Sequence, residues 1–378
     1  MKTTQSIAII TGPFGCLPPH AIGAVEKIWF SVGEHWRDEG YNICYCSKSP
    51  NNISYTANNH VYVKGYQRTG NKVFDFVLDF VYSYKALKRI PTCDIVIINC
   101  IWGPILYPLF KRKFGGALYN VARYPKRQMG LYKNIDCLAC VSAPIAKAVI
   151  SQSPQIKDKV CVVSNPIDTY IYNKEGKRNI SQEPLIIYTG RVHQEKGLDI
   201  LVKAISELKR RYNVRLKIIG ATKIEEGGSG KEYVDYLNSL ASNWNIEWME
   251  PIYTPTELAA EMNKGDIYCY PSVAEKGESF GCAPLEAMGL GLPTIVSDLD
   301  CFKDFVDNGE NGMVFNHRSD NAYKELANCI EILLNDKELY AKLSEGGIHT
   351  SKRFSVESIA DQYMTILNKI LNHASVND

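Results

Sequence analysis

The 378-residue sequence lacks a long uninterrupted hydrophobic run. Its longest apolar stretch, residues 95–110, is broken by Asn99, Gly103 and two prolines, which argues against a membrane-spanning helix. The opening residues contain one lysine and only a short apolar run before Thr11, too short for the core of a signal peptide. We therefore expect a cytoplasmic protein.

The twelve cysteines show no zinc-type spacing with two ligand pairs. Cys137 and Cys140 are separated by two residues, which could be a redox or zinc motif, but no second pair accompanies them. Most cysteines lie in apolar runs typical of strands, where a free thiol behaves as a small hydrophobic side chain. We expect reduced, buried, structural cysteines.

Internal repeats and low-complexity tracts are also missing, and what is present is an alternation of short apolar runs with helix-like segments. This rhythm indicates parallel sheets wrapped by helices. Strands are expected in the first half at 6–12, 41–47, 94–100, 116–122, 136–142 and 160–166, and in the second half at 185–190, 214–221, 246–250, 266–272, 293–298 and 312–315.

The polar segment 173–184 has no apolar period and is interpreted as a linker. A chain of this length exceeds what one hydrophobic core usually serves. We therefore expect two doubly wound α/β domains that face each other across a cleft. The chain ends in three helical stretches.

Charge is divided unequally, although the net charge is only +2. Residues 1–165 contain 20 Lys and Arg against 9 Asp and Glu, and the remainder contains 23 against 32. A positive first half attracts an anionic partner, such as a membrane surface, a phosphorylated acceptor or nucleic acid. The alternative is a set of solvated basic faces that merely complement the acidic half.

Three loops at expected strand ends contain residues suited to ligand binding. The loop at residues 12–23 is rich in glycine and includes His20 and Gly23, but it does not form the G-x-G-x-x-G pattern of dinucleotide-binding proteins. Residues 189–197 place Arg191 and Lys196 between Gly190 and Gly197, a cationic pocket that could neutralise a diphosphate.

The third loop places two carboxylates, Glu278 and Glu286, around the start of a helix. Free backbone amides at a helix start suit a phosphate, and a carboxylate can accept hydrogen bonds from a pair of sugar hydroxyls. The pair could alternatively be solvated surface residues or the two acids of a retaining glycosidase.

Together, these motifs resemble the retaining glycosyltransferases of family 4, which have the GT-B fold. Residues 278–286 match the E-x7-E motif of that family. The similarity extends to other second-half motifs, at 190–197, 219–220, 270–272, 293–298 and 309–312. In the first half, residues 23–26 resemble the Gly-Gly-x-Glu loop of the family, and residues 165–168 resemble its N-P-x-D.

The resemblance implies roles for individual residues. Arg191 and Lys196 would hold the donor diphosphate and stabilise the leaving nucleotide, Glu278 would contact the transferred sugar, and Glu286 would bind the ribose. Donor contacts are also implied for Gly23, Gly190, Ser279, Phe280, Gly281 and Cys282. No cofactor or metal is expected, because the two cations replace a metal.

The first half departs from the family pattern. The family's His-x-His is absent at Asn99, and its histidine is absent at residues 121–124. Acceptor contacts are therefore assigned to His20, Arg123 and Lys126. Asp298 and Asp300 form a D-x-D, which manganese-dependent transferases of another fold use, but here it follows an expected strand in a family-like segment.

The resemblance implies domains at 1–168 (acceptor) and 169–355 (nucleotide-sugar donor), with a helix near 356–372 packing back on the first. The expected activity is transfer of a hexose from a nucleotide-diphosphate sugar to a glycan acceptor, either lipid-linked or a precursor of a cell-surface polysaccharide. Peripheral contact with the inner face of the cell membrane is expected through the basic half, and nucleic-acid binding is not. The alternatives are a GT-B epimerase or hydrolase of nucleotide sugars and a non-catalytic nucleotide-sugar-binding subunit.

Overall fold

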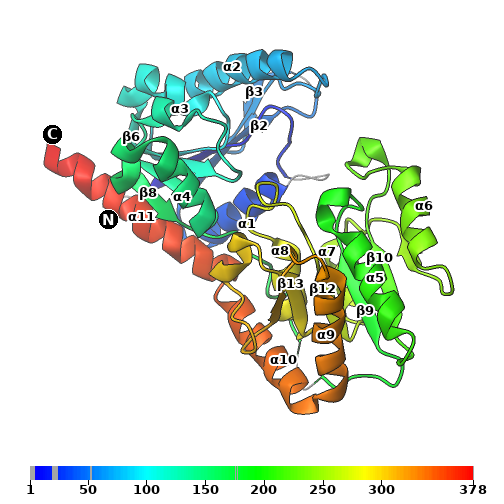
Figure 1. Cartoon of the computed structure of the whole chain (residues 1–378). Coiled ribbons are helices and arrows are strands. Elements are labelled where there is room, and N and C mark those ends of the chain that lie inside the picture. Colours follow the sequence, from blue (N-terminus) through cyan, green and yellow to red (C-terminus); the bar gives the residue numbers. More distant parts are fainter. Residues whose placement is uncertain (1–4, 19–23, 52, 175, 177, 378) are drawn as a thin grey trace. The chain divides into compact units, whose positions relative to one another are not determined.

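The structure is a computed structural model that describes residues 5–18, 24–51, 53–174, 176 and 178–377. The chain folds into two compact units (Figure 1). The first comprises residues 1–166 and 356–378, and the second comprises residues 167–355. Residues 173–184 therefore belong to the second unit, and the chain crosses between units at residues 166–167 instead. Arg178 fixes this segment, because its guanidinium donates to the carbonyls of Gly265 (2.7 Å) and Leu290 (2.9 Å).

The first unit contains an eight-stranded sheet in the order β3-β4-β2-β1-β5-β6-β7-β8, parallel except for β3 against β4. Its strands are β1 (Ser6–Ile10), β2 (Asn42–Lys48), β3 (Tyr55–Ala57), β4 (His60–Val63), β5 (Cys93–Ile98), β6 (Phe114–Val121), β7 (Cys137–Cys140) and β8 (Val160–Val162). Its helices are α1 (Ala24–Asp38), α2 (Lys72–Arg89), α3 (Gly103–Leu106), α4 (Ala143–Gln152) and α11 (Val356–Asn377), with short 3₁₀ turns at Tyr107–Lys113, Met129–Tyr132 and Pro154–Lys159.

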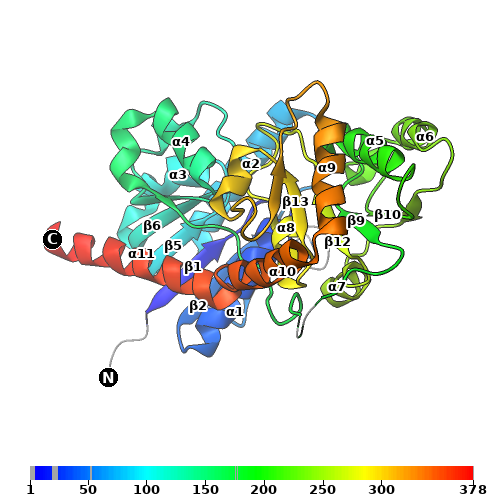
Figure 2. The same cartoon turned by 60° about the horizontal axis from the view of Figure 1, so that its bottom comes forward.

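Helix α11 completes the face of this sheet that α1 covers only in part (Figure 2). Right-handed crossovers place α1 on one face and α2, α3 and α4 on the other. Helix α11 then packs beside α1 and across β5 and β6. Gly116 allows the close approach, since a Cβ there would lie 2.3 Å from Ile370. Trp36 Nε1 donates to the carbonyl of Ala360 (3.3 Å).

The second unit contains a six-stranded parallel sheet in the order β11-β10-β9-β12-β13-β14. Its strands are β9 (Leu185–Thr189), β10 (Arg215–Ile219), β11 (Glu247–Met249), β12 (Ile267–Tyr270), β13 (Thr294–Ser297) and β14 (Met313–Phe315). Its helices are α5 (Leu198–Leu208), α6 (Lys231–Leu240), α7 (Pro255–Met262), α8 (Cys282–Gly289), α9 (Ala322–Asn335) and α10 (Lys337–Lys352), with 3₁₀ turns at Gln194–Lys196, Ile224–Glu226 and Asp300–Asp304.

All twelve expected strands are present, and the described residues contain two further strands, β3 and β4, that the sequence does not predict. These strands are only three and four residues long, and the two buried valines of β4, Val61 and Val63, are too few to form an apolar run that marks a strand. The twelve cysteines are free. Cys137 does not face Cys140, and its Sγ lies 3.1 Å from that of Cys161 on the neighbouring strand β8.

Candidate active site

The two second-half loops identified in the sequence lie side by side in the second unit. Strand β9 pairs with β12, and the chain leaves these two strands toward opposite edges of the sheet. The carboxyl ends of strands at such a switch point are where doubly wound sheets bind ligands. The loop with Arg191 and Lys196 follows β9, and the loop with Glu278 follows β12.

Glycines bring these loops together. Gly197 has a left-handed φ of 63°, and a Cβ at this position would lie 2.2 Å from the carbonyl oxygen of Pro271. A Cβ at Gly220, after β10, would lie 1.8 Å from the carbonyl oxygen of Gly190. Only glycine allows these backbone approaches. They hold the ends of three neighbouring strands in contact.

Lys196 and Glu278 form a buried ion pair. The Lys196 side chain is 8% exposed and that of Glu278 is 10% exposed, and Lys196 Nζ lies 2.6 Å from Glu278 Oε2. Lys196 Nζ also donates to the Tyr270 hydroxyl (2.9 Å). The lysine was expected to pair with an anionic ligand, but in the structure its counterion is a carboxylate of the chain itself.

Arg191 also has an internal counterion. Its Nη2 lies 2.8 Å from Glu195 Oε1, and its Nη1 donates to the carbonyl of Gly227 (2.9 Å). Nearly half of the Arg191 side chain is exposed. Because an exposed ion pair contributes little free energy, a ligand phosphate can replace Glu195 at small cost.

The entrance of α8 is shaped by one glycine and one buried aromatic ring. Gly281 caps the helix with a left-handed φ of 90°, and Ser279, Gly281 and Cys282 are partly exposed. Phe280 is different, because its buried ring packs against Phe305 (centroids 5.3 Å apart) and Phe354 (5.7 Å). Only the backbone of Phe280 is therefore available to a ligand.

Three tyrosines that the sequence analysis did not assign surround the ion pair. Tyr270 stacks on Tyr188 (5.6 Å) and Tyr268 (6.4 Å). Burial raises the pKa of all three hydroxyls, and both Glu278 and Glu286 add to the upward shift in the pKa of Tyr268. The two glutamates thus act on one buried hydroxyl. The sequence does contain a signal for these residues, the alternation Tyr268-Cys-Tyr270 in an expected buried strand. Each buried tyrosine hydroxyl needs a hydrogen-bond partner, which predicts polar groups nearby.

Glu195 is a second residue that the sequence analysis did not assign. Its backbone carbonyl accepts hydrogen bonds from Val273 N (2.9 Å) and Ser272 Oγ (3.3 Å), which ties the β9 loop to the β12 loop. Its side chain is the counterion of Arg191. One residue therefore positions both loops.

The proposed acceptor residues lie in the first unit. Arg123 and Lys126 are exposed in the loop that follows β6, while His20 and Gly23 lie outside the described residues. The strand ends that lack the family's histidines instead contain two asparagines. Asn120 Nδ2 donates to Asn99 Oδ1 (2.9 Å), and the buried Asn120 Oδ1 has no hydrogen-bond partner among the described residues.

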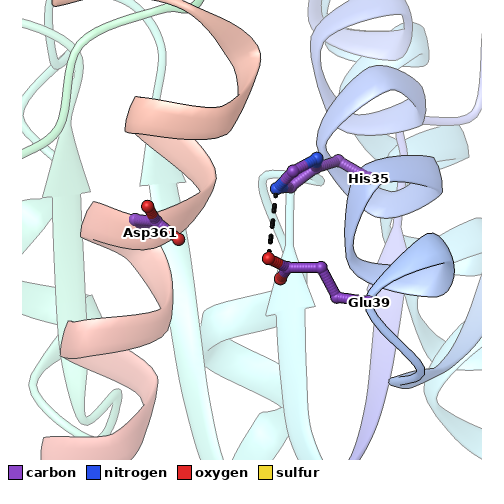
Figure 3. Close-up of side chains that lie close together, drawn as sticks. All are labelled: His35, Glu39 and Asp361. Carbon is purple, nitrogen blue, oxygen red and sulfur yellow. Dashed lines mark ion pairs between the residues drawn. The ribbon is translucent and has the colours of Figure 1, made fainter.

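The D-x-D aspartates are engaged in ion pairs. Asp298 contacts His317 and lies 2.7 Å from Arg318 Nη1, and Asp300 lies 2.6 Å from Lys303. In the described part of the chain, one group of metal-ligand type has its ligand atoms within 4.8 Å of one another, and it consists of His35 and Glu39 on α1 and Asp361 on α11 (Figure 3). His35 and Glu39 form an ion pair at 3.6 Å.

Within the described residues, no helix combines the length and the apolar character needed to cross a membrane.

Comparison with protein families matches residues 172–350 to the model of "Glycosyl transferases group 1". The D-inositol 3-phosphate glycosyltransferase of Corynebacterium glutamicum is 25% identical over 260 residues, which covers 65% of this chain and 60% of the relative. The capsular polysaccharide biosynthesis glycosyltransferase CapM of Staphylococcus aureus is 27% identical over 192 residues, covering 50% and 47%. The chain spans 57–64% of the length of the first curated relatives that it matches.

Solved structures match nearly the whole chain. Sucrose-phosphate synthase from Thermosynechococcus elongatus has a TM-score of 0.75 at 17% identity and covers 98% of this chain and 100% of its own. Anabaena Alr3699/HepE, solved with UDP and glucose, has a TM-score of 0.72 at 16% identity, covering 97% and 100%. The expected GT-B fold is confirmed by these similarities.

Proposed function

We propose that this chain is a group 1 glycosyltransferase that transfers a hexose from a nucleotide-diphosphate sugar to a glycan acceptor, and the match of residues 172–350 to the family model supports this proposal. The acceptor is either lipid-linked or a precursor of a cell-surface polysaccharide. The similarity to CapM, whose name refers to capsular polysaccharide, supports the second part.

The buried Lys196–Glu278 pair at the switch point is the observation that carries the proposal. A buried lysine beside a carboxylate and a hydroxyl can exchange partners when a diphosphate arrives, because the ligand supplies a stronger anion. Lys196 and Arg191 then hold the leaving diphosphate. Glu278, released from the lysine, accepts hydrogen bonds from the hydroxyls of the transferred sugar.

Glu286 is proposed to bind the nucleotide ribose, and the backbone at Ser279, Gly281 and Cys282 is proposed to contact the donor. Glu286 lies in the second turn of α8, so it and Glu278 stand on either side of the helix entrance. This arrangement suits a ligand with a sugar at one end and a nucleoside at the other. Gly190 lets the backbone approach the phosphates.

The reaction is proposed to retain anomeric configuration and to require no metal. The leaving phosphate would assist attack from the same face of the sugar, so no nucleophile of the protein is needed. Two cations beside the phosphates supply the positive charge that a metal would provide. The D-x-D aspartates, with His317 and Lys303 as partners, are not assigned to catalysis.

The acceptor is proposed to be anionic and to lie at a membrane surface on the cytoplasmic side. The support is the excess of 20 basic over 9 acidic residues in the first 165. Arg123 and Lys126, both exposed after β6, are proposed to bind its phosphate.

Nucleotide binding by two variants tests the donor assignment. We expect UDP, GDP or ADP to raise the melting temperature, since a hundredfold excess over Kd stabilises by about 2.7 kcal/mol. Glu286→Ala should weaken nucleotide binding. Glu278→Gln should not weaken free-nucleotide affinity, because Lys196 no longer has to leave a carboxylate to bind the diphosphate, but it should reduce sugar transfer. Glu345→Gln, at an exposed site in the same unit, is the matched control.

Equal loss of nucleotide affinity in both variants would contradict these roles. Breakdown or epimerisation of the nucleotide sugar as fast without acceptor as with it would favour the GT-B epimerase or hydrolase. Stabilisation by nucleotide with no turnover of any nucleotide sugar would favour a non-catalytic subunit.

A further inference from the structure

Helix α2 carries its apolar side chains on the outside. It lies on the outer side of the first unit beside α3 (Figure 1). Six of its large apolar residues are 39–74% exposed: Val73, Phe74, Phe76, Val77, Phe80 and Tyr84. A surface helix normally presents its polar residues to solvent, so this face is the reverse of the usual pattern.

The buried side of the same helix is partly polar. Asp79 is only 4% exposed, and its Oδ1 accepts hydrogen bonds from Trp102 N (3.0 Å) and Ser83 Oγ (3.1 Å). Burial raises the pKa of the Asp79 carboxyl. Burying the Asp79 carboxyl costs free energy unless it is hydrogen-bonded. The same helix nevertheless exposes its phenylalanines, and the packing of the first unit does not require that arrangement.

The exposed apolar surface continues onto neighbouring segments. The Trp102 ring packs against Phe76 (centroids 4.8 Å apart) and Phe80 (5.1 Å), and the Tyr84 ring packs against Phe110 (5.6 Å). Leu109 is exposed beside Phe110 in the sequence. We call α2 with these three residues (Trp102, Leu109 and Phe110) the α2 face.

A cationic pocket lies at the C-terminal end of the α2 face. Its walls include four cations, a tyrosine and a serine: Lys64, Lys85, Lys88, Arg89, Tyr84 and Ser54. Among the described residues, none of the four cations has a carboxylate within ion-pair distance, and no carboxylate lines the pocket. Four uncompensated cations around one pocket suit a phosphate group.

We propose that the α2 face docks on an anionic lipid bilayer, with its apolar side chains in the headgroup–acyl boundary and a lipid phosphate in the cationic pocket. An apolar stripe flanked by Lys and Arg is the pattern of helices that lie in the plane of a membrane surface. Aromatic rings prefer this depth, and each nearby cation adds attraction to anionic lipid. A protein partner would favour fewer lysines around the apolar centre.

This inference deepens the membrane part of the proposed function and rests on it only for the reason why the protein would visit a membrane. The test contains no nucleotide. Nucleotide-induced stabilisation, measured on the same preparations, separates failure of this proposal from failure of donor binding.

Vesicle flotation of the full-length protein tests the proposal. We expect binding to vesicles that contain phosphatidylglycerol, weak binding to pure phosphatidylcholine, and release at high salt. The double variants Phe74→Ser/Val77→Ser and Lys85→Ala/Lys88→Ala should each reduce partitioning by about tenfold or more. Each variant is first checked for an unchanged melting temperature.

Matched controls come from the second unit. Ile224→Ser/Tyr253→Ser alters exposed apolar residues, and Lys231→Ala/Lys337→Ala alters exposed lysines. Both should bind vesicles as the unchanged protein does. Trp102 fluorescence gives a local readout: anionic vesicles should shift its emission to shorter wavelength, and Trp102→Phe should remove that component.

Three results would overturn the proposal. The first is no flotation with anionic vesicles at low salt. The second is equal binding to vesicles with and without phosphatidylglycerol, together with unchanged binding by Lys85→Ala/Lys88→Ala. The third is a concentration-dependent dimer that Phe74→Ser/Val77→Ser dissociates while vesicle binding is absent, which would assign the α2 face to a second copy of the chain.

Discussion

At the scale of single residues, the buried Lys196–Glu278 pair changes how these two charged side chains are understood. The sequence suggested one residue for phosphate and one for sugar, each waiting for its ligand. In the structure they neutralise each other at 2.6 Å while both are nearly buried. Removing one partner therefore leaves an uncompensated buried charge, which costs about 3–5 kcal/mol.

A double-mutant cycle on this pair should show strong coupling. Lys196→Met and Glu278→Gln should each lower the free energy of unfolding. The double variant should lose about 1–3 kcal/mol less than the sum of the two single losses. Chemical unfolding measures the three free energies. The exposed Lys303–Asp300 pair, treated identically, should show coupling near zero. Additive effects at Lys196 and Glu278 would mean that the two charges do not stabilise each other.

His60 makes stability depend on pH. It is 7% exposed, its Nε2 lies 2.8 Å from Ser47 Oγ, and burial, together with the nearby charge of Arg37, lowers its pKa from 6.5 to about 4. The unfolded chain therefore binds a proton that the folded protein does not between about pH 6.5 and pH 4. We expect stability to fall through this window as pH decreases, by about 2 kcal/mol after allowance for solvent screening.

Urea unfolding at several pH values checks this expectation. His60→Gln, which can still hydrogen-bond to Ser47, should flatten the pH dependence between pH 6.5 and pH 4. His349→Gln, at an exposed position, should not. Equal slopes for the unchanged protein and the His60 variant would show that other groups control acid sensitivity.

At the scale of elements, the entrance of α8 depends on one backbone conformation. Gly281 caps the helix at φ 90°, and a Cβ there would lie 2.7 Å from Cε1 of the buried Phe302 ring. The helix therefore starts where it does because both the left-handed conformation and the missing side chain are available at this residue.

Gly281→Ala should destabilise more than Gly309→Ala. Both glycines have left-handed φ values, 90° and 78°, so both substitutions carry a backbone strain of about 1 kcal/mol. A Cβ at Gly309 meets nothing within 4 Å, whereas at Gly281 the collision adds about 1–3 kcal/mol. Differential scanning calorimetry measures the difference. Equal melting temperatures for Gly281→Ala and Gly309→Ala would mean that the Phe302 ring moves aside without loss of stability.

At the scale of the whole molecule, the first unit is built from two separate parts of the chain. Its sheet face over β5 and β6 is covered only when α11 returns after the second unit. The chain crosses twice, and the crossing segments pair where Ile167 N donates to the carbonyl of Phe354 (2.8 Å). The first unit is therefore complete only when residues 356–377 have packed onto it.

Tyr363→Ala should destabilise the first unit specifically. Tyr363 is buried on α11, and its ring lies 4.8 Å from Trp29 and 6.5 Å from Trp36 on α1. Removing the ring opens a cavity at a cost of about 3 kcal/mol or more. Tryptophan fluorescence should report a lower unfolding midpoint, while the half-exposed Tyr253→Ala should change little. An unchanged midpoint would contradict the role of α11.

The sequence by itself determined the strands, their α/β alternation and the positions of the functional loops. The apolar run and the turn residues that end it are local properties of the chain, and a parallel sheet makes its carboxyl ends meet on one edge. Arg191, Lys196, Glu278 and Glu286 could be singled out for that reason. The hairpin β3–β4 could not, because its strands are only three and four residues long, too short for a recognisable period.

Only the tertiary structure decided which charges meet and which side of each helix is covered. Lys196 and Glu278 are 82 residues apart, so their pairing depends on the adjacency of β9 and β12. Asp79 of α2 is buried and accepts a hydrogen bond from the backbone of Trp102, whereas the phenylalanines of the same helix are exposed. Periodicity shows that a helix has two different faces, but the partner available for each face determines which one is buried.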